Sequence, residues 1–347
     1  MNASKRIEYI DSMRGFTMLL VVVYHVATFC LGIGEYVPSI HPFLCEFRMP
    51  LFFFISGFVL YKEETIWNVS YITRFLLVKK FPAQIITTSI FFSVFLIINH
   101  IGIAEGLYSD SKLGYWFTLN LYLFFCVYAI CRYVLYLIHC KSIYTDIIIL
   151  SVGALFFLLF YVPSVLSMLP IDNDLKSLLS MEKWGYFLFF AMGTLFRKHF
   201  SMVQIILDKT PVLMICLIIF FGLNLYYVEL RASHINLLKL ATALTGIVIV
   251  FSFFRIHQDI FKKEKFIGRC LQYVGRRTLD IYLLHFLLLP VNLKMHFTFL
   301  VEHPMPIVEL AITIIIMLIV VAGCLLISKI LRMSPTLAYL LFGVRKR

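Results

Sequence analysis

The stretch FTMLLVVVYHVATFCL, residues 16–31, is a continuous apolar run that contains one histidine, His25. Arg14 stands just before the run, eleven positions ahead of His25. Eleven residues are close to three turns of α-helix, so both side chains would share one helix face, about 16 Å apart along the axis. An ionisable side chain inside a membrane helix is costly and indicates function. We therefore predict a membrane helix with Arg14 at one surface and His25 deep inside.

The composition extends this prediction to the whole chain. Of the 347 residues, 61% are hydrophobic and only 14% are charged, and the mean hydropathy is +0.91. Soluble domains are about 45–50% apolar and about a quarter charged. Similar apolar runs recur along the full length without the alternation of barrel strands. We expect one all-α, polytopic transmembrane domain over residues 1–347.

Ten runs are candidate membrane spans, and most hold the roughly 20 residues that a crossing needs. They are residues 14–33, 43–61, 81–100, 115–138, 144–162, 184–196, 211–228, 236–256, 279–301 and 306–331.

The positive charge follows this topology. The net charge is +12, and ten spans with a cytoplasmic N-terminus place most of the 31 lysines and arginines in cytoplasmic segments. We therefore expect both termini in the cytoplasm of a multi-pass protein of the inner or plasma membrane, and no nucleic-acid partner. The basic segment 255–277 also carries apolar residues at helical spacing. It is either a helix attracted to anionic membrane lipid or a landing site for a polyanionic cytoplasmic ligand.

Few residues within the spans could carry chemistry. A neutral His25 could act as a general base, and Arg14 offers a planar fork suited to phosphate. Asp11 extends the same polar stripe, which would face a cavity in the protein. His285 is the second embedded histidine and shares a face with Tyr282. It is either a packing histidine or a cavity-lining one.

The second span opens with FRMPLFFFISGF, residues 47–58. Arg48 lies near its outer mouth, Pro50 suits a first helical turn, and Gly57 predicts close helix packing. The eight cysteines are scattered and lack the paired spacing of a metal site, so we expect no metal. Whether Cys30 and Cys45 pair is left open.

Five segments resemble motifs of the membrane acyltransferase-3 family, over about residues 7–330, and YWFTLNLY (residues 115–122) is a weaker match. The first two, YIDSMRGFTMLLVVVYH (residues 9–25) and FRMPLFFFISGF, are fairly specific. WGYFLFFAMGTLF (184–196) resembles a short aromatic helix, and TLDIYLLH (278–285) a late histidine motif. The resemblance implies an integral-membrane O-acyltransferase that modifies surface glycans or related molecules.

The resemblance also implies roles for single residues. Cytoplasmic acyl-CoA, most simply acetyl-CoA, would be a co-substrate rather than a bound cofactor, with its phosphates held by Arg14. His25 would deprotonate a hydroxyl of a cell-envelope glycan or lipid-linked sugar, and Arg48 would orient the acceptor or stabilise negative charge. Lys79 and Lys80 would add to the donor site, although RFLLVKKFP (residues 74–82) departs from the paired arginines of many relatives.

Two other functions could explain the same sequence features. A transporter or flippase could use the polar stripe as a translocation path, but acidic groups are scarce in mid-span and no repeated halves are detectable. A non-catalytic subunit of an envelope-assembly complex would leave His25 without a role.

Overall fold

The computed structural model describes residues 7–33, 41–63, 65–109, 111–230 and 236–343. These ranges are mostly helical and contain no strand, as the all-α prediction requires. The chain divides into two compact units. The first joins Met1–Phe52 to Phe200–Ser328, and the second joins Phe53–His199 to Lys329–Arg347.

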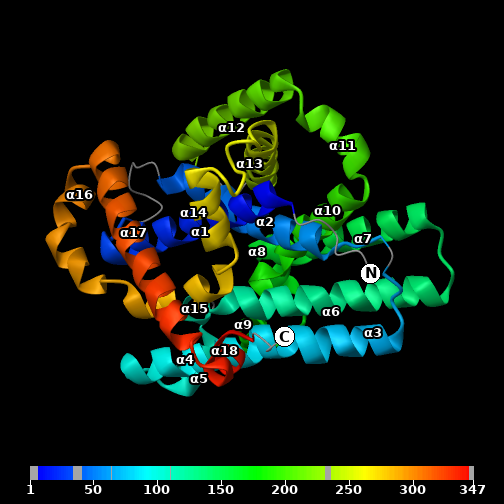
Figure 1. Cartoon of the computed structure of the whole chain (residues 1–347), viewed down its shortest axis with the longest axis horizontal. Helices are drawn as coiled ribbons and strands as arrows, with labels where there is room; N and C mark the ends of the chain where they lie inside the picture. The colour runs from blue at the N-terminus through cyan, green and yellow to red at the C-terminus, as the bar shows by residue number, and fades with distance from the viewer. Residues whose placement is uncertain (1–6, 34–40, 64, 110, 231–235, 344–347) are drawn as a thin grey trace. The chain divides into compact units, whose positions relative to one another are not determined.

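The first unit joins the N-terminal segment of the sequence to a later stretch that stops before the C-terminal end (Figure 1). Its helices are α1 (Glu8–His25), the first part of α2 (His41–Leu60), α11 (Phe200–Leu207), α12 (Thr210–Leu230), α13 (Asn236–Ile256), α14 (Phe266–Gly275), α15 (Thr278–Leu288), α16 (Thr298–Glu302) and most of α17 (Pro306–Leu331). A π-helical turn, Val26–Cys30, continues α1.

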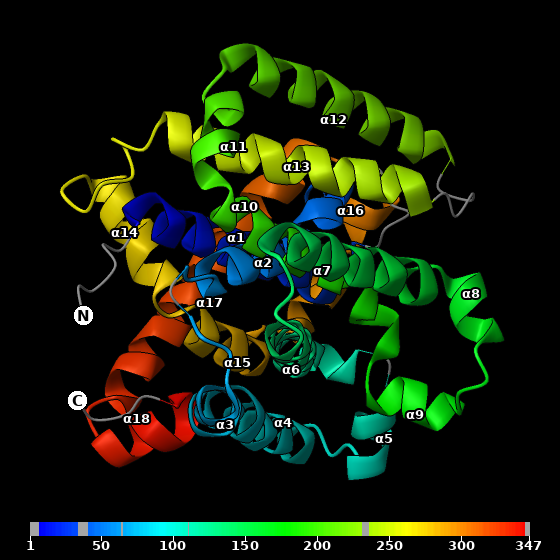
Figure 2. The same cartoon turned by 90° about the vertical axis from the view of Figure 1, so that its right-hand side faces the viewer.

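Helix α1 lies at the core of this unit, with α13, α14 and α15 packed against it. Figure 2 shows α14 crossing α1, and α12 lying beside α13. At the crossing of α1 and α14 the two backbones touch. A Cβ atom on Gly15 would overlap the carbonyl oxygen of Leu271, and one on Gly275 would overlap that of Asp11. Two glycines therefore set the distance between these helices.

The second unit holds the middle of the chain and its C-terminal end. Its helices are α3 (Val69–Thr73), α4 (Thr87–Ile98), α5 (Ile103–Tyr108), α6 (Trp116–Leu137), α7 (Ser142–Phe156), α8 (Pro163–Met168), α9 (Asn173–Leu178), α10 (Phe187–Lys198) and α18 (Pro335–Phe342). Helix α2 ends in this unit. A Cβ on its Gly57 would overlap the carbonyl oxygen of Phe190, and one on Gly193 that of Phe54. The close packing predicted at Gly57 is confirmed, and α10 is the partner.

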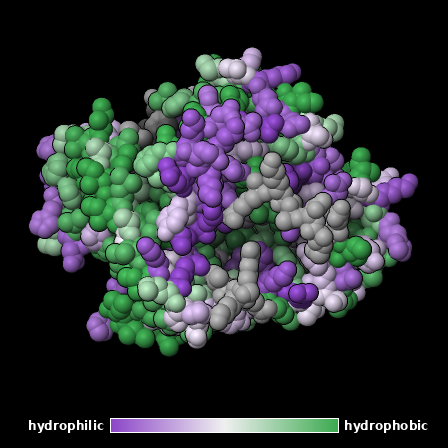
Figure 3. Space-filling view, viewed as in Figure 1, coloured by the Kyte–Doolittle hydropathy of each residue, from purple (hydrophilic) through white to green (hydrophobic). Residues whose placement is uncertain are grey.

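Six helical stretches within the described residues are long and apolar enough to cross a membrane, and a bent pair would make a seventh. The six are Glu8–Cys30, Val69–Ile98, Trp116–Leu137, Ser142–Tyr161, Leu237–Ile256 and Pro306–Leu331. The bent pair, Phe200–Leu207 and Thr210–Leu225, turns by 75°. Their outward apolar side chains suit a hydrocarbon surrounding. Figure 3 shows such a hydrophobic surface over α16 and α17, where Ile307 and Ile319 are exposed.

The helix expected over 81–100 begins earlier than the sequence indicated. It runs without interruption from Val69 to Ile98, although Pro82 cannot donate a backbone hydrogen bond. The turns around this proline, Arg74–Lys80 and Pro82–Ile86, are π-helical, and Phe81 N–H donates to the carbonyl of Leu76. This wider hydrogen-bonding pattern carries the helix past the proline.

Two other expected spans are shorter as helices. Within 279–301, α15 ends at Leu288, because Leu289 is extended before Pro290 and a residue that precedes proline disfavours helical geometry. Within 184–196, a 3₁₀ segment, Met181–Tyr186, precedes the twelve-residue α10. Neither stretch is long enough to span a membrane as one straight helix.

Candidate active site

Arg14 and His25 lie on one continuous helix, as predicted, and both reach the same neighbouring helix, α15. Arg14 Nη2 donates to Thr278 Oγ1 at 3.3 Å, and His25 Nδ1 lies 2.8 Å from His285 Nε2. Thr278 is the first residue of α15, and His285 lies seven positions, about two turns, further on. The shared face that the eleven-residue spacing predicted therefore looks onto α15.

The hydrogen bonds around His285 determine which nitrogen of each ring carries a proton. His285 Nδ1 lies 3.0 Å from the carbonyl oxygen of Ile281, and a carbonyl can only accept. His285 therefore donates from Nδ1, and in its neutral form it presents a lone pair at Nε2. His25 Nδ1 must then donate to that lone pair. A neutral His25 consequently carries its own lone pair on Nε2, the arrangement that a general base requires.

The two histidines differ in exposure. His285 is completely buried, whereas His25 is only partly buried. The ring of Phe286 lies 4.8 Å from the His25 ring and 4.0 Å from the His285 ring, centre to centre. The Phe29 ring lies 5.8 Å from that of His25. Aromatic rings thus surround the buried His285, whereas the partly buried His25 can meet a substrate.

Tyr282 and Asp280 take different places on α15. Tyr282 is buried, and its ring centre lies 6.0 Å from that of His285, so the predicted shared face is correct. Asp280 is also buried and accepts a hydrogen bond from Ser328 Oγ. Asp280 lies five positions before His285, an offset of about 140° around the helix, so the two side chains point in different directions.

Asp11 lies at the crossing of α1 and α14. It is buried, and its Oδ2 lies 3.9 Å from Nε of Arg276. Fourteen residues separate it from His25, about 21 Å along a helix axis. Asp11 therefore lies at the Arg14 end of α1 and near Arg276, whereas Arg14 and His25 contact α15.

Arg48 lies on α2 in the same unit and stacks on a neighbour of His25. Its Cζ is 3.3 Å from the ring centre of Tyr24, and the Tyr24 and His25 rings are 5.4 Å apart. Only 8% of Arg48 is exposed. Its Nε and Nη1 atoms are buried without a hydrogen-bond partner among the described residues. Such a group is rare in a folded protein and calls for an explanation.

Lys79 and Lys80 belong to the second unit and lie in the continuous helix Val69–Ile98 rather than in a loop. Lys79 is exposed. Lys80 Nζ lies 4.1 Å from the ring centre of Phe125 and 5.5 Å from that of Phe75, in cation–π contacts.

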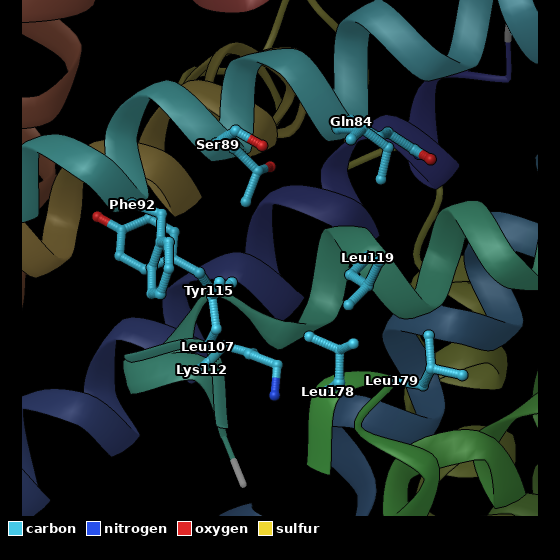
Figure 4. Close-up of a pocket in the computed structure, with 11 residues that line it drawn as sticks. Gln84, Ser89, Phe92, Leu107, Lys112, Tyr115, Leu119, Leu178 and Leu179 are labelled. Atoms are coloured by element: carbon cyan, nitrogen blue, oxygen red, sulfur yellow. The ribbon is translucent and has the colours of Figure 1, made fainter. Parts of the chain in front are cut away.

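The second unit also contains a largely apolar cavity of about 280 Å³ (Figure 4). Its lining comes from the Gln84–Phe92 stretch, α5, α6 and the end of α9, with Lys112 and Tyr115 beside them. Lys112 is buried and donates to the backbone carbonyls of Ser109 and Ser177. Gln84 Oε1 is a buried acceptor without a partner in the described part of the chain. The cavity therefore has a mostly apolar wall with several polar side chains in it, Thr88 and Ser89 among them.

Sequence reasoning missed Thr278 and Phe286, which contact Arg14 and His25. The signal for Thr278 was present in the spacing, because Thr278 and His285 are two turns apart and so lie on one face. Tyr24 was also missed, since an aromatic residue beside a histidine has no distinctive pattern. Within the described residues, no group of three or more His, Cys, Asp or Glu side chains could hold a metal ion. The side chain of Cys45 lies outside the described residues.

Residues 7–329 match a family model described as an acyltransferase domain, Acyl_transf_3. The match runs through both units and covers nearly the whole chain. Comparison with curated proteins and with solved structures gave no match.

Proposed function

The chain belongs to the acyltransferase-3 family, and we propose that it is a membrane O-acyltransferase that uses His25 as its general base. The acyl group, most simply acetyl, comes from cytoplasmic acyl-CoA. The acceptor is a hydroxyl of a cell-envelope glycan or a lipid-linked sugar. The proposal places the protein in the inner or plasma membrane, with ten crossings and both termini in the cytoplasm.

The relay from His25 through His285 to the Ile281 carbonyl is the observation that carries this proposal. This relay leaves the lone pair of a neutral His25 on Nε2. The residue that holds the His25 ring in place, His285, is itself buried. When Nε2 takes a proton, His285 Nε2 accepts from the charged imidazole. This arrangement supports proton abstraction from a hydroxyl and its later return.

The reaction follows from that relay. His25 Nε2 removes the hydroxyl proton, and the acceptor oxygen attacks the thioester carbonyl carbon. A C–O bond forms, the C–S bond of the tetrahedral intermediate breaks, and the departing thiolate takes the proton back from His25. Direct transfer of this kind needs no covalent acyl-enzyme intermediate.

Arg14 supplies the donor site. Its guanidinium is held to Thr278 at the first turn of α15, where helix amide groups and the helix dipole also favour an anion. At about 16 Å from His25 along α1, it can hold phosphate groups while the thioester reaches the histidine. Lys79 and Lys80 are further donor contacts in this proposal.

Acyl transfer in sealed vesicles tests the function. We expect label from radioactive acetyl-CoA, added to the cytoplasmic face, to appear in a glycan fraction as a base-labile ester. A transporter would move label or glycan without forming that ester. Arg14→Ala should raise the KM for acetyl-CoA, while Arg269→Ala, at an exposed arginine of α14, should not. An unchanged KM in Arg14→Ala would remove the phosphate role.

A further inference from the structure

Arg48 is a buried cation beside the proposed base. Its guanidinium lies flat against Tyr24, the residue before His25, with Cζ 3.3 Å from the ring centre. Only 8% of the residue is exposed, so it is 92% buried. A cation over an aromatic face gains some stabilisation, but the contact satisfies none of the N–H groups of the guanidinium.

The hydrogen-bonding potential of Arg48 is largely unused. Nε and Nη1 are buried and donate to nothing in the described part of the chain, and no ion pair to Arg48 forms there. Burying a charge with unmade hydrogen bonds destabilises a protein, and buried charges are normally paired. The contrast with Arg255 is direct, because that arginine holds Asp208 Oδ1 at 2.7 Å and Gln204 Oε1 at 2.9 Å.

We propose that Arg48 is the receptor for an anionic group, a carboxylate or a phosphate, on the acceptor molecule. The inference rests on the proposed function and narrows it. The acceptor is then a sugar acid or a sugar phosphate that presents its hydroxyl to His25. A guanidinium is suited to both anions, since it donates through a planar fork.

The position of Arg48 separates this anion from the donor. Tyr24 is ten residues from Arg14, about 15 Å along α1, so donor phosphates held at Arg14 do not reach Arg48. A transient oxyanion at the thioester carbon is the competing use of Arg48. A stable anion on the acceptor compensates the buried charge whenever substrate is bound, whereas the oxyanion does so only during reaction.

Thermal unfolding of the full-length protein in detergent tests the inference directly, because a ligand that binds only the folded state raises the midpoint. The probes are glucuronate, glucose 6-phosphate and neutral glucose at matched ionic strength. We expect one or both anions to raise the midpoint and glucose to leave it unchanged. The two anions distinguish a carboxylate from a phosphate receptor.

Arg48→Met keeps the length of the side chain and removes its charge, and it should abolish the anion-dependent rise. Arg269→Met, at an exposed arginine, is the matched control and should retain it. An equal rise in Arg48→Met, or no rise in the wild type, would overturn the inference. His25→Ala should keep the rise while losing transfer, so a failure of the proposed function is distinguishable from a failure of this inference.

Discussion

Two imidazole rings share one hydrogen bond at the centre of the proposed site, and this constrains both of them. Because His285 already donates to Ile281, it can only accept from His25. If both histidines were protonated, two positively charged rings would face each other across the 2.8 Å between His25 Nδ1 and His285 Nε2. In the proposed mechanism, His285 is therefore a positioning residue, because accepting from His25 Nδ1 keeps the lone pair of a neutral His25 on Nε2.

Replacing His285 should separate this role from simple packing. His285→Gln retains a side chain that can accept from His25, whereas His285→Leu removes the acceptor and keeps an apolar residue in a fully buried place. We expect kcat to fall in both variants and to fall further in His285→Leu, with the KM for the acyl donor unchanged.

The pH profile gives a second readout of the same pair. A base must be neutral, so the wild-type rate should fall as the pH drops, and His285→Gln should move the pH at which that fall occurs. Equal kcat in His285→Leu and wild type, with an unmoved profile, would show that His285 only packs.

At the scale of helices, the crossing of α1 and α14 positions the site. Helix α1 carries Arg14 and His25, and α14 leads directly into α15 with Thr278 and His285. The two backbones meet at Gly15 and Gly275, where an added methyl group would meet main-chain atoms rather than mobile side chains. The close contact therefore helps to set the register of α1 against α15.

Gly15→Ala and Gly275→Ala should each destabilise the protein by about 1–3 kcal/mol, the usual cost of overpacking. Gly222→Ala on α12 is the control, because nothing lies within 4 Å of its Cβ position. There alanine should be neutral or stabilising by up to about 1 kcal/mol. Unfolding midpoints measure both effects. Stability losses of equal size at all three glycines would argue against a specific crossing.

The sequence predicted which segments are helical, and which residues share a helix face, better than it predicted where the helices end. A run of apolar residues with Arg14 and His25 in phase was sufficient to predict α1 and the face that these two residues share. The end of α15 was missed, although Pro290 marked it, because hydrophobicity alone continued to residue 301. Near Pro82 the error was the opposite one. The helix was predicted to begin at residue 81, but π-helical turns allow it to continue through the proline.

At the scale of the whole molecule, composition and charge indicated a membrane protein, and the family match over residues 7–329 agrees with the resemblance inferred from five short segments. The His25–His285 contact joins residues 260 positions apart, and no single sequence shows such a pairing. The Arg48 nitrogens that lack a hydrogen-bond partner among the described residues were equally invisible, because their state depends on what surrounds the side chain in three dimensions.

The central claim is that His25 is the general base of an acyltransferase. The most direct measurement is the rate of ester formation from labelled acetyl-CoA by wild type, His25→Ala and His257→Ala, with folding checked by unfolding midpoints. His257 is an exposed histidine of the same unit. We predict a loss of about 10²–10⁴-fold in His25→Ala and a wild-type rate in His257→Ala. A folded His25→Ala protein that transfers label at the wild-type rate would contradict the account.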